Sequence, residues 1–270
     1  MTTSIDHRLA PATAPGRRAR VIFLIALTAV CALIAAVLPR IPQDPKYYQF
    51  ADHRAFLGVP NFFDVASNAG FLVVGVLGLA LLARGRSALF ADPRERAPYW
   101  VFFASIALVS LGSTYHHLAP DVYRLFWDRL PMAVAFVAFL AAVVAERVSV
   151  TAGARLLWPL VLLGAGSTIY WRWTEQQGAG DLRLYGFVQF FPLLAVPLIA
   201  LLFPSRYTRG GDLWLVLLLY GLAKLAELLD PQILAGTGGA VSGHTLKHVL
   251  AAWALVWVVR SLRERRAVAL

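Results

Sequence analysis

Long runs of apolar residues dominate the sequence, and short polar segments separate them. Each run holds about 18 residues or more, close to the roughly 20 that a helix needs to cross the hydrocarbon core of a bilayer. The sequence therefore predicts an all-α fold, a polytopic bundle of transmembrane helices. The motif WRW at 171–173 ends one run, where interfacial aromatic residues are typical. Eight spans are expected, at 21–39, 62–84, 99–118, 130–145, 155–171, 184–203, 212–229 and 245–262.

The first apolar run has two interpretations. Arg17, Arg18 and Arg20 precede VIFLIALTAVCALIAAVL, and basic residues precede both a retained N-terminal helix and a cleaved secretory signal. We favour a retained helix at 21–39 that follows an N-terminal tail at 1–20. The remaining spans form one membrane domain, and residues 263–270 form a C-terminal tail.

Composition supports the membrane class, and charge gives an orientation. Hydrophobic residues make up 59% of the 270 residues, charged residues make up 15%, and the mean hydropathy is +0.64, values typical of an integral membrane protein. The net charge of +10 is compatible with nucleic-acid binding, but its distribution fits membrane orientation better. Sixteen arginines fall on the side of the N-terminus, and seven basic residues fall on the other. Both termini are therefore predicted to be cytoplasmic. The seven are Arg40, Lys46, Arg54, Arg124, Arg129, Arg172 and Arg183.

Polar side chains with useful chemistry gather at the outer ends of three spans. Ser113 and His117 lie near the end of the third span, Asp128 lies where the chain turns back into the fourth, and His244 and His248 begin the eighth. Because successive spans alternate in direction, all five residues fall at one depth. Such residues are costly in hydrocarbon, so they are candidates for a functional site.

The spacing of these residues points to a metal. Residues four apart share a helix face, so Ser113 with His117, and His244 with His248, project as pairs. The single cysteine lies in the first run, which leaves His, Asp and Glu as ligands. Three imidazoles form the ligand set of a catalytic zinc, which lowers the pKa of water to roughly 7, and Asp128 is the natural base. Taken singly, the histidines are compatible with helix contacts, Ser113 with packing and Asp128 with an N-cap.

A second polar face follows at the start of the second span. Asn61, Asp64 and Asn68 lie on nearly one helical face, and Ser67 lies beside them. One interpretation is a polar seam between packed helices. The other is support for the zinc site, or a hard cation bound by oxygen ligands.

The remaining ionisable residues have plainer interpretations. His116 points away from His117 and is expected to be a packing or interfacial residue. We expect His7 and His53 to be exposed to solvent. Lys224 and Glu227 are three residues apart within a span, and a mutual ion pair lowers the cost of burying both.

Together these motifs resemble the alkaline ceramidase family, part of a superfamily of seven-helix membrane hydrolases that includes the adiponectin and progestin receptors. The matching motifs are SN at 67–68, GSxxxH at 112–117, DxLPM at 128–132 and HxxxH at 244–248. The interval of eleven residues from His117 to Asp128 also matches. The resemblance covers about 47–262, so the helix at 21–39 is an addition to the seven-helix core.

The resemblance implies a zinc-dependent hydrolase of linear amide C–N bonds. Its substrate is a ceramide-like membrane lipid, which is cleaved at the N-acyl bond to a sphingoid base and a fatty acid. His117, His244 and His248 bind Zn²⁺ in this family pattern, Asp128 handles the proton of the water, and Ser113 lies by the metal. No nucleic-acid partner is expected.

Calcium is one departure from the family pattern. Animal members bind Ca²⁺ through an acidic segment that leads into the first helix, with a Glu where Asn61 stands in this chain. Residues 43–60 hold no comparable acidic cluster, although Asp44, Asp52 and Asp64 are candidates to replace it. A calcium requirement is left open.

Other classes of function compete with the hydrolase. A receptor-like or non-enzymatic zinc protein of the same superfamily is the main alternative, and intramembrane histidines also serve haem and metal-transport proteins. A retinal Schiff base on Lys224 is argued against by Glu227. The compact, Arg- and Ala-rich composition favours a bacterial inner membrane, with the site toward the periplasmic leaflet. The sequence does not determine acyl length, head group or oligomeric state.

Overall fold

The computed structural model describes residues 16–84 and 89–268, so His7 lies outside the described residues. Within those ranges the chain is helical, with two isolated bridge pairs and no strand. The expected all-α class is confirmed. The helices are α1 (Arg17–Val37), α2 (Phe62–Ser67), α3 (Ala69–Ala83), α4 (Arg96–Leu118), α5 (Val122–Val143), α6 (Val150–Gln176), α7 (Arg183–Leu202), α8 (Asp212–Leu228), α9 (Asp230–Gly236) and α10 (Gly243–Glu264).

Seven helical segments in the described part of the chain are long and apolar enough to cross a membrane. They correspond to seven of the eight expected spans, and α2 with α3 forms one of them. The other expected span, 212–229, is α8, which has 17 residues. A helix of that length is about 25 Å long, slightly less than the roughly 30 Å of a hydrocarbon core. The chain therefore has the architecture of an integral membrane protein.

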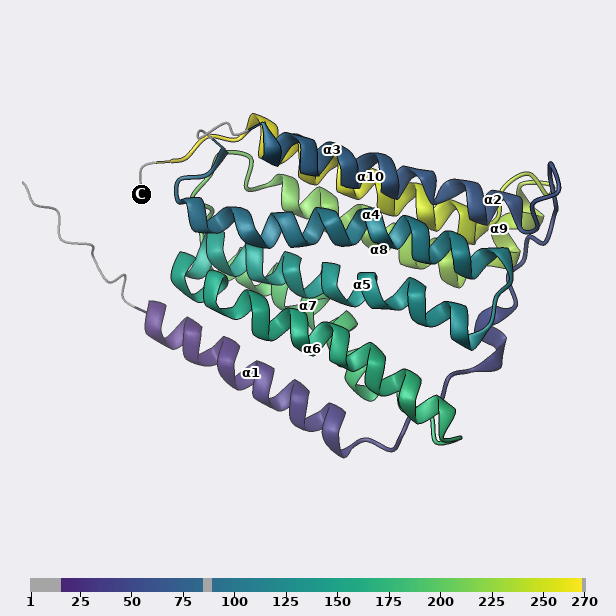
Figure 1. Ribbon diagram of the computed structural model, residues 1–270. Coiled ribbons are helices and arrows are strands. Elements are labelled where there is room, and N and C mark those ends of the chain that lie inside the picture. Colours follow the sequence, from purple (N-terminus) through teal and green to yellow (C-terminus); the bar gives the residue numbers. More distant parts are fainter. Residues whose placement is uncertain (1–15, 85–88, 269–270) are drawn as a thin grey trace, which may run out of the picture.

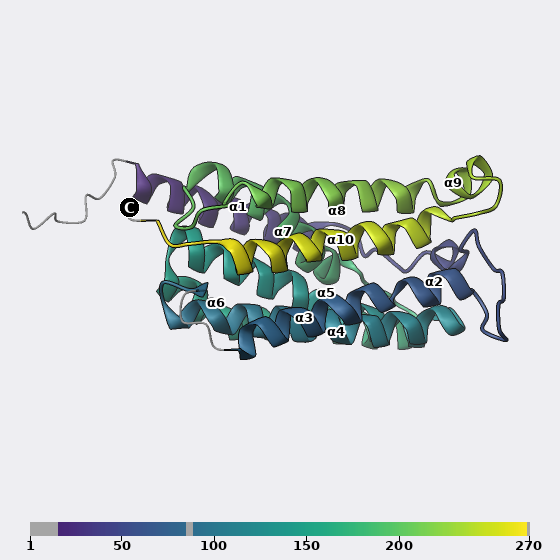
Figure 2. The same ribbon diagram turned by 90° about the horizontal axis from the view of Figure 1, so that it is seen from above.

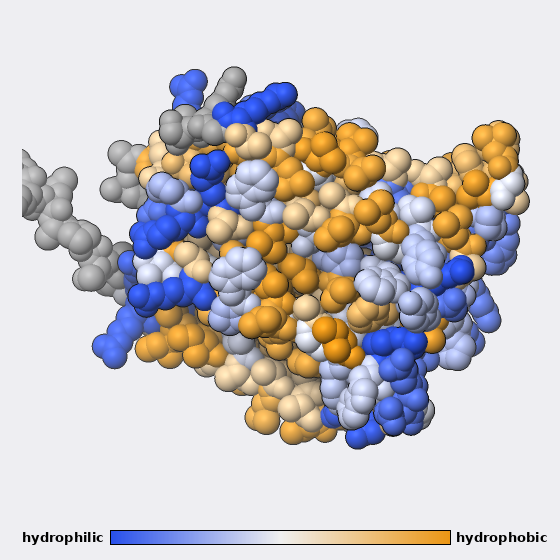
Figure 3. Space-filling view, in the orientation of Figure 1, coloured by the Kyte–Doolittle hydropathy of each residue, from blue (hydrophilic) through white to orange (hydrophobic). Residues whose placement is uncertain are grey.

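The helices run side by side along one direction (Figures 1 and 2). α1 begins, and the described chain ends, at the same end of the bundle, while α9 and the starts of α2 and α10 lie at the opposite end (Figure 1). Hydrophobic side chains cover most of the middle of one face, and hydrophilic ones gather mainly toward its two ends (Figure 3). This pattern fits a bundle whose middle lies in hydrocarbon.

The centre of the bundle is built from α3, α4, α5 and α10. α4 packs on both α3 and α5, α5 also packs on α6, and α8 packs on α10. Phe71, Phe103, Ala138 and Leu262 belong to the buried cluster between these helices. By contrast, α1 packs mainly on α7, and none of its residues is buried. This N-terminal helix therefore lies at the periphery of the bundle.

A glycine sets the close approach of α4 and α5. A Cβ added to Gly112 would collide with the carbonyl oxygen of Trp127 and approach the backbone nitrogen of Asp128. Small residues permit such contacts between membrane helices. The absence of a side chain at Gly112 therefore lets the backbone of α4 next to Ser113 contact the backbone of α5 next to Asp128.

The start of α5 differs from the sequence interpretation. Asp128 is not at the turn and is not an N-cap, because α5 begins at Val122 and Asp121 caps it by accepting a hydrogen bond of 2.7 Å from the backbone N–H of Arg124. Asp128 instead lies in the second turn of the helix and is buried. Because Asp121 provides the cap, the carboxylate of Asp128 is free for other contacts.

Gly112→Ala should destabilise the protein, because the added methyl group forces α4 and α5 apart. We expect the free energy of unfolding to fall by roughly 1–3 kcal/mol, the usual cost of overpacking. Thermal melting of detergent-solubilised protein measures the change. Gly166→Ala in α6 is the matched control, because its Cβ meets open space. Equal melting temperatures for the two variants would contradict the proposed contact.

Candidate metal centre

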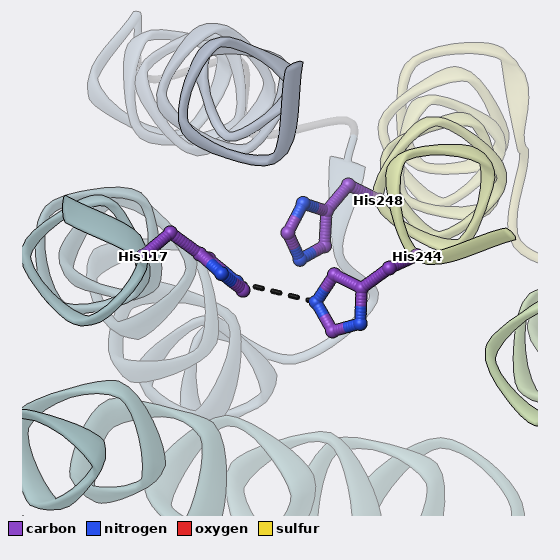
Figure 4. A group of neighbouring side chains, drawn as sticks. All are labelled: His117, His244 and His248. Atoms are coloured by element: carbon purple, nitrogen blue, oxygen red, sulfur yellow. Dashed lines mark hydrogen bonds between the residues drawn. The ribbon is translucent and has the colours of Figure 1, made fainter. Parts of the chain in front are cut away.

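Three histidines converge near the end of the bundle that is opposite to the termini. His117 comes from the last turn of α4, and His244 and His248 come from the first turns of α10. Figure 4 shows the three rings pointing toward one another. One ring nitrogen from each lies within 4.8 Å of the others, and all three residues are buried. The chain therefore brings together the three imidazoles that the sequence placed at one depth.

Hydrogen bonding fixes which nitrogen of His248 is free. Ser67 Oγ donates to the carbonyl oxygen of Asp64 at 3.0 Å and lies 2.8 Å from His248 Nδ1. Because the hydroxyl has one hydrogen, Nδ1 must carry the proton and donate it to Ser67. His248 Nε2 then keeps a lone pair. A partner of this kind on the far nitrogen is typical of histidine ligands to metals.

The other two imidazoles have the spacing of zinc ligands. His117 Nε2 and His244 Nε2 are 3.2 Å apart. Two nitrogens on a tetrahedral zinc, each at 2.0–2.1 Å, are about 3.3 Å apart. Two neutral lone pairs cannot face each other at this distance without a proton or a cation between them. The donor set therefore fits a zinc ion held by His117, His244 and His248.

Contacts from α9 and the loop before α10 position the two histidines of α10. Ser242 caps α10 by accepting a hydrogen bond of 2.9 Å from the backbone N–H of Thr245. Asp230 accepts 2.8 Å hydrogen bonds from the backbone N–H groups of His244 and Ala51. Asp230 is itself buried. Its two hydrogen bonds connect the start of α9, the start of α10 and the segment around Ala51 at the site.

The polar face at 61–68 supports this centre. Asn61 donates to the carbonyl oxygen of His117 at 2.8 Å, and Asp64 accepts a 2.7 Å hydrogen bond from Thr245. Asn68 donates to the backbone of Asp64, as Ser67 does. These bonds tie the start of the second span to α4 and α10. The structure therefore combines the helix-packing and supporting roles considered for this face.

A second cation on the same face stays a prediction. Asp44 caps a short turn, and Asp52 pairs with Arg54 at 2.6 Å, which holds the pKa of the Asp52 carboxyl below its usual value. Asp64 is bonded to Thr245. In the part of the chain that the structure describes, these acids form no cluster of metal ligands.

Asp128 and Ser113 lie beside the centre, in the wall of a cavity that His248 also lines. The hydroxyl of Ser113 lies beside the Asp128 carboxylate, and Asp128 Oδ1 is buried without a partner among the described residues. This oxygen remains available to a proton.

Sequence reasoning missed Lys247 as part of the site. Its buried Nζ lies 3.0 Å from His244 Nε2 and 3.0 Å from Glu227 Oε1. The signal was present, because an ionisable residue three positions after His244 shares its helix face. The single lone pair of His244 Nε2 binds one cation at a time. A metal ion on His244 Nε2 therefore releases Lys247 from this nitrogen and leaves its ion pair with Glu227.

A second missed contribution comes from the segment before α2. The ring of Phe50 packs at 4.7 Å from the His117 ring and at 4.4 Å from the His244 ring, and it covers the centre. Tyr48 lies nearby against His116, and burial raises the pKa of its phenol to about 12. Tyr48 therefore stays neutral at physiological pH.

The remaining predicted residues fall as follows. His116 is buried against aromatic rings outside the ligand group, and His53 is exposed, as expected. The expected ion pair of Lys224 and Glu227 is present. The interfacial role for the WRW motif is wrong for Trp171, because this ring is fully buried beneath Arg129.

Purified protein should carry roughly one zinc per chain, because three buried lone pairs converge on one point. Elemental analysis of protein purified without added metal measures the content. The double variant His244→Ala/His248→Ala should lose the zinc. Replacing the exposed His53 with Ala is the matched control and should not change the metal content. Equal and negligible zinc in all three proteins would overturn the assignment.

Comparisons with known proteins add nothing to this geometry. No model of a protein family, no curated protein and no solved structure matches the chain. The functional argument therefore depends on the residues themselves: three convergent imidazoles, a buried carboxylate with one unpartnered oxygen, and the cavity that His248 and Asp128 line.

Proposed function

We propose that this chain is a zinc-dependent membrane amidase that cleaves the N-acyl bond of ceramide-like lipids, as in the alkaline ceramidases that its motifs resemble. The products are a sphingoid base and a fatty acid. One observation carries the proposal. Three buried imidazoles converge beside a cavity, which one of them, His248, lines together with Asp128 and Ser113 and whose remaining walls are mostly apolar.

The shape and lining of the cavity suit a lipid chain. From His248 and Asp128 its walls continue along α4, α5, α7, α8 and α10. Its far end is lined by apolar side chains, including Phe139, Leu255 and Val258. Apolar walls with a few convergent polar groups at one end are typical of ligand sites. An acyl chain in this cavity places its carbonyl group beside His248 and Asp128.

The reaction needs proton transfer that the chain can perform. Hydrolysis adds the hydroxyl of water to the acyl carbon, breaks the C–N bond and adds a proton to the leaving nitrogen. Zinc, when bound, supplies a Lewis acid that polarises the carbonyl and makes water more acidic. Asp128 accepts the proton of the water and delivers it to the amine. Once Asp128 has taken the proton of the water, the hydroxyl hydrogen of the adjacent Ser113 is free to donate to the developing charge on the acyl oxygen.

The proposal includes an arrangement in the membrane. α8 counts as a crossing, which gives a seven-helix core at about 47–262 and α1 as an added helix. Both termini are cytoplasmic because arginines are concentrated at that end. The metal centre then lies toward the periplasmic leaflet of a bacterial inner membrane, where a lipid reaches it from the side.

A receptor-like zinc protein is the main alternative. It requires the same three histidines but assigns no role to Asp128. Burying this carboxylate in an apolar bundle costs free energy. The position of Asp128 beside Ser113, in the wall of the same cavity as His248, favours catalysis. Turnover distinguishes the two functions.

The direct test is incubation of zinc-loaded protein with a ceramide that carries a labelled acyl chain. We expect equal amounts of free fatty acid and sphingoid base, loss of both after chelation, and recovery when zinc is restored. A panel of other N-acyl lipids, followed by mass spectrometry, defines the substrate class. If fully loaded protein cleaves none of them at any pH or calcium level, the receptor-like function replaces the amidase.

Asp128→Asn separates metal binding from chemistry. If Asp128 moves protons and is not a ligand, the variant should keep its zinc and lose activity by a factor of about 10²–10⁴. Zinc content and turnover are measured on the same preparation. Asp121→Asn, which alters the cap of the same helix, is the control and should retain activity. Loss of zinc together with activity in Asp128→Asn would instead make Asp128 a ligand or a structural residue.

A further inference from the structure

A second apolar groove lies between α1 and α7, separate from the cavity described above. Its walls come from one side of α1, between Cys31 and Leu38, and from α7, including Phe187, Phe190 and Leu194. Three cations also line it: Arg129, Arg183 and Lys224. Among the described residues that line the groove, none is acidic. The groove therefore combines a long apolar wall with an excess of positive charge.

Arg129 is the unusual member of the three. Only 5% of the residue is exposed, and its guanidinium lies over the rings of Tyr47, Trp171 and Tyr185 at 4.4–5.0 Å. No carboxylate among the described residues pairs with it, and Nη1 is buried without a hydrogen-bond partner. Its neighbour Asp128 faces the other cavity. A buried charge of this kind is costly unless an anion completes it.

The other two cations are already paired. Arg183 is held by Asp181 at 2.7 Å, and Lys224 shares Glu227 with Lys247. Arg183 also donates to the carbonyl oxygens of Ala36 and Leu38 at the end of α1. The positive charge available to a ligand is therefore that of Arg129.

α1 is fastened at its two ends. At the inner end Arg17 and Arg20 donate to the carbonyl oxygens of Val148 and Leu202 at 2.6 and 2.8 Å. At the outer end Arg183 makes the bonds described above, and Leu182 donates to Ile41 at 2.8 Å. Between these attachments no residue of α1 is buried. The groove runs along the last part of α1, from Cys31 to Leu38, where there is room for an elongated apolar molecule.

We propose that the groove between α1 and α7 binds a free long-chain fatty acid, with its chain along the apolar wall and its carboxylate on Arg129. A guanidinium binds a carboxylate through two parallel N–H donors, with energy and geometry that an alcohol lacks. The three rings around Arg129 leave little access, which suits a terminal carboxylate better than a phosphodiester flanked by two bulky groups. Binding does not require hydrolysis, and only a role as the exit for product depends on the proposed function.

The test uses radiolabelled palmitate and chelated protein, so that no metal holds the carboxylate, at an alkaline pH that ionises the probe. Hexadecanol and hexadecylamine, with the same chain, are the competitors. We expect palmitate to bind about tenfold or more tightly than either, the usual range for a charged hydrogen-bonded pair. Arg129→Gln should remove this preference and leave hexadecanol binding unchanged. The control is Arg124→Gln on the same helix, which is already paired with Asp121.

Wild-type protein supplies a second measurement if Arg129→Gln does not fold. Cys31 is the single cysteine of the chain and lines the groove. Palmitate should slow its modification by N-ethylmaleimide, whereas hexadecylamine should not. Equal affinity for the three probes, equal effects of the two arginine variants, or unprotected Cys31 would overturn the proposal. None of these results depends on amidase activity, so the failure of one proposal is distinguishable from the failure of the other.

Discussion

A polar group buried in an apolar bundle must find a partner, and this requirement organises the end of the bundle that holds the three histidines. The metal centre meets it through shared contacts. Ser67 serves both the carbonyl of Asp64 and the ring of His248, and Asp230 serves two backbone N–H groups from separate segments. Among the described residues, Asp128 Oδ1 keeps no partner, and the three imidazoles meet without a bridging group between them. A cation at that point would satisfy the imidazole lone pairs.

Close backbone contacts fix the positions of the helices that carry these polar groups. Gly112 brings α4 onto α5, and Gly243 brings the start of α10 against the carbonyl oxygen of Ala226 in α8. A side chain at Gly112 would push α4, which carries His117, away from α5, and one at Gly243 would push α10, which carries His244, away from α8. The small residues that allow close helix packing therefore help to position the helices that carry the ligands.

Much of this arrangement could be predicted from the sequence. Apolar runs located the helices, and alternation of direction placed His117 and the pair at 244–248 at one depth. Predictions from the local sequence failed where two residues are candidates for the same structural role. Asp128 was placed at the turn before its helix, with an N-cap as the alternative to a catalytic base, but Asp121 supplies the cap and Asp128 lies in the second turn. Trp171 was assigned to the interface, but it lies beneath Arg129. The spacing of residues in the sequence predicts which of them share a helix face. It does not predict which other helix that face contacts.

The cavity and the groove share three wall residues, Tyr47, Gln189 and Lys224, but differ in charge. The cavity holds the carboxylates of Asp128 and Glu227 beside its cations, whereas the described wall of the groove holds cations only. If the proposed hydrolysis is correct, a neutral amide meets no charge penalty in the cavity, whereas its carboxylate product is attracted to the metal, repelled by Asp128 and attracted to Arg129. Once the carboxylate has left the metal, the unpaired charge of Arg129 favours its transfer toward the groove beside α1.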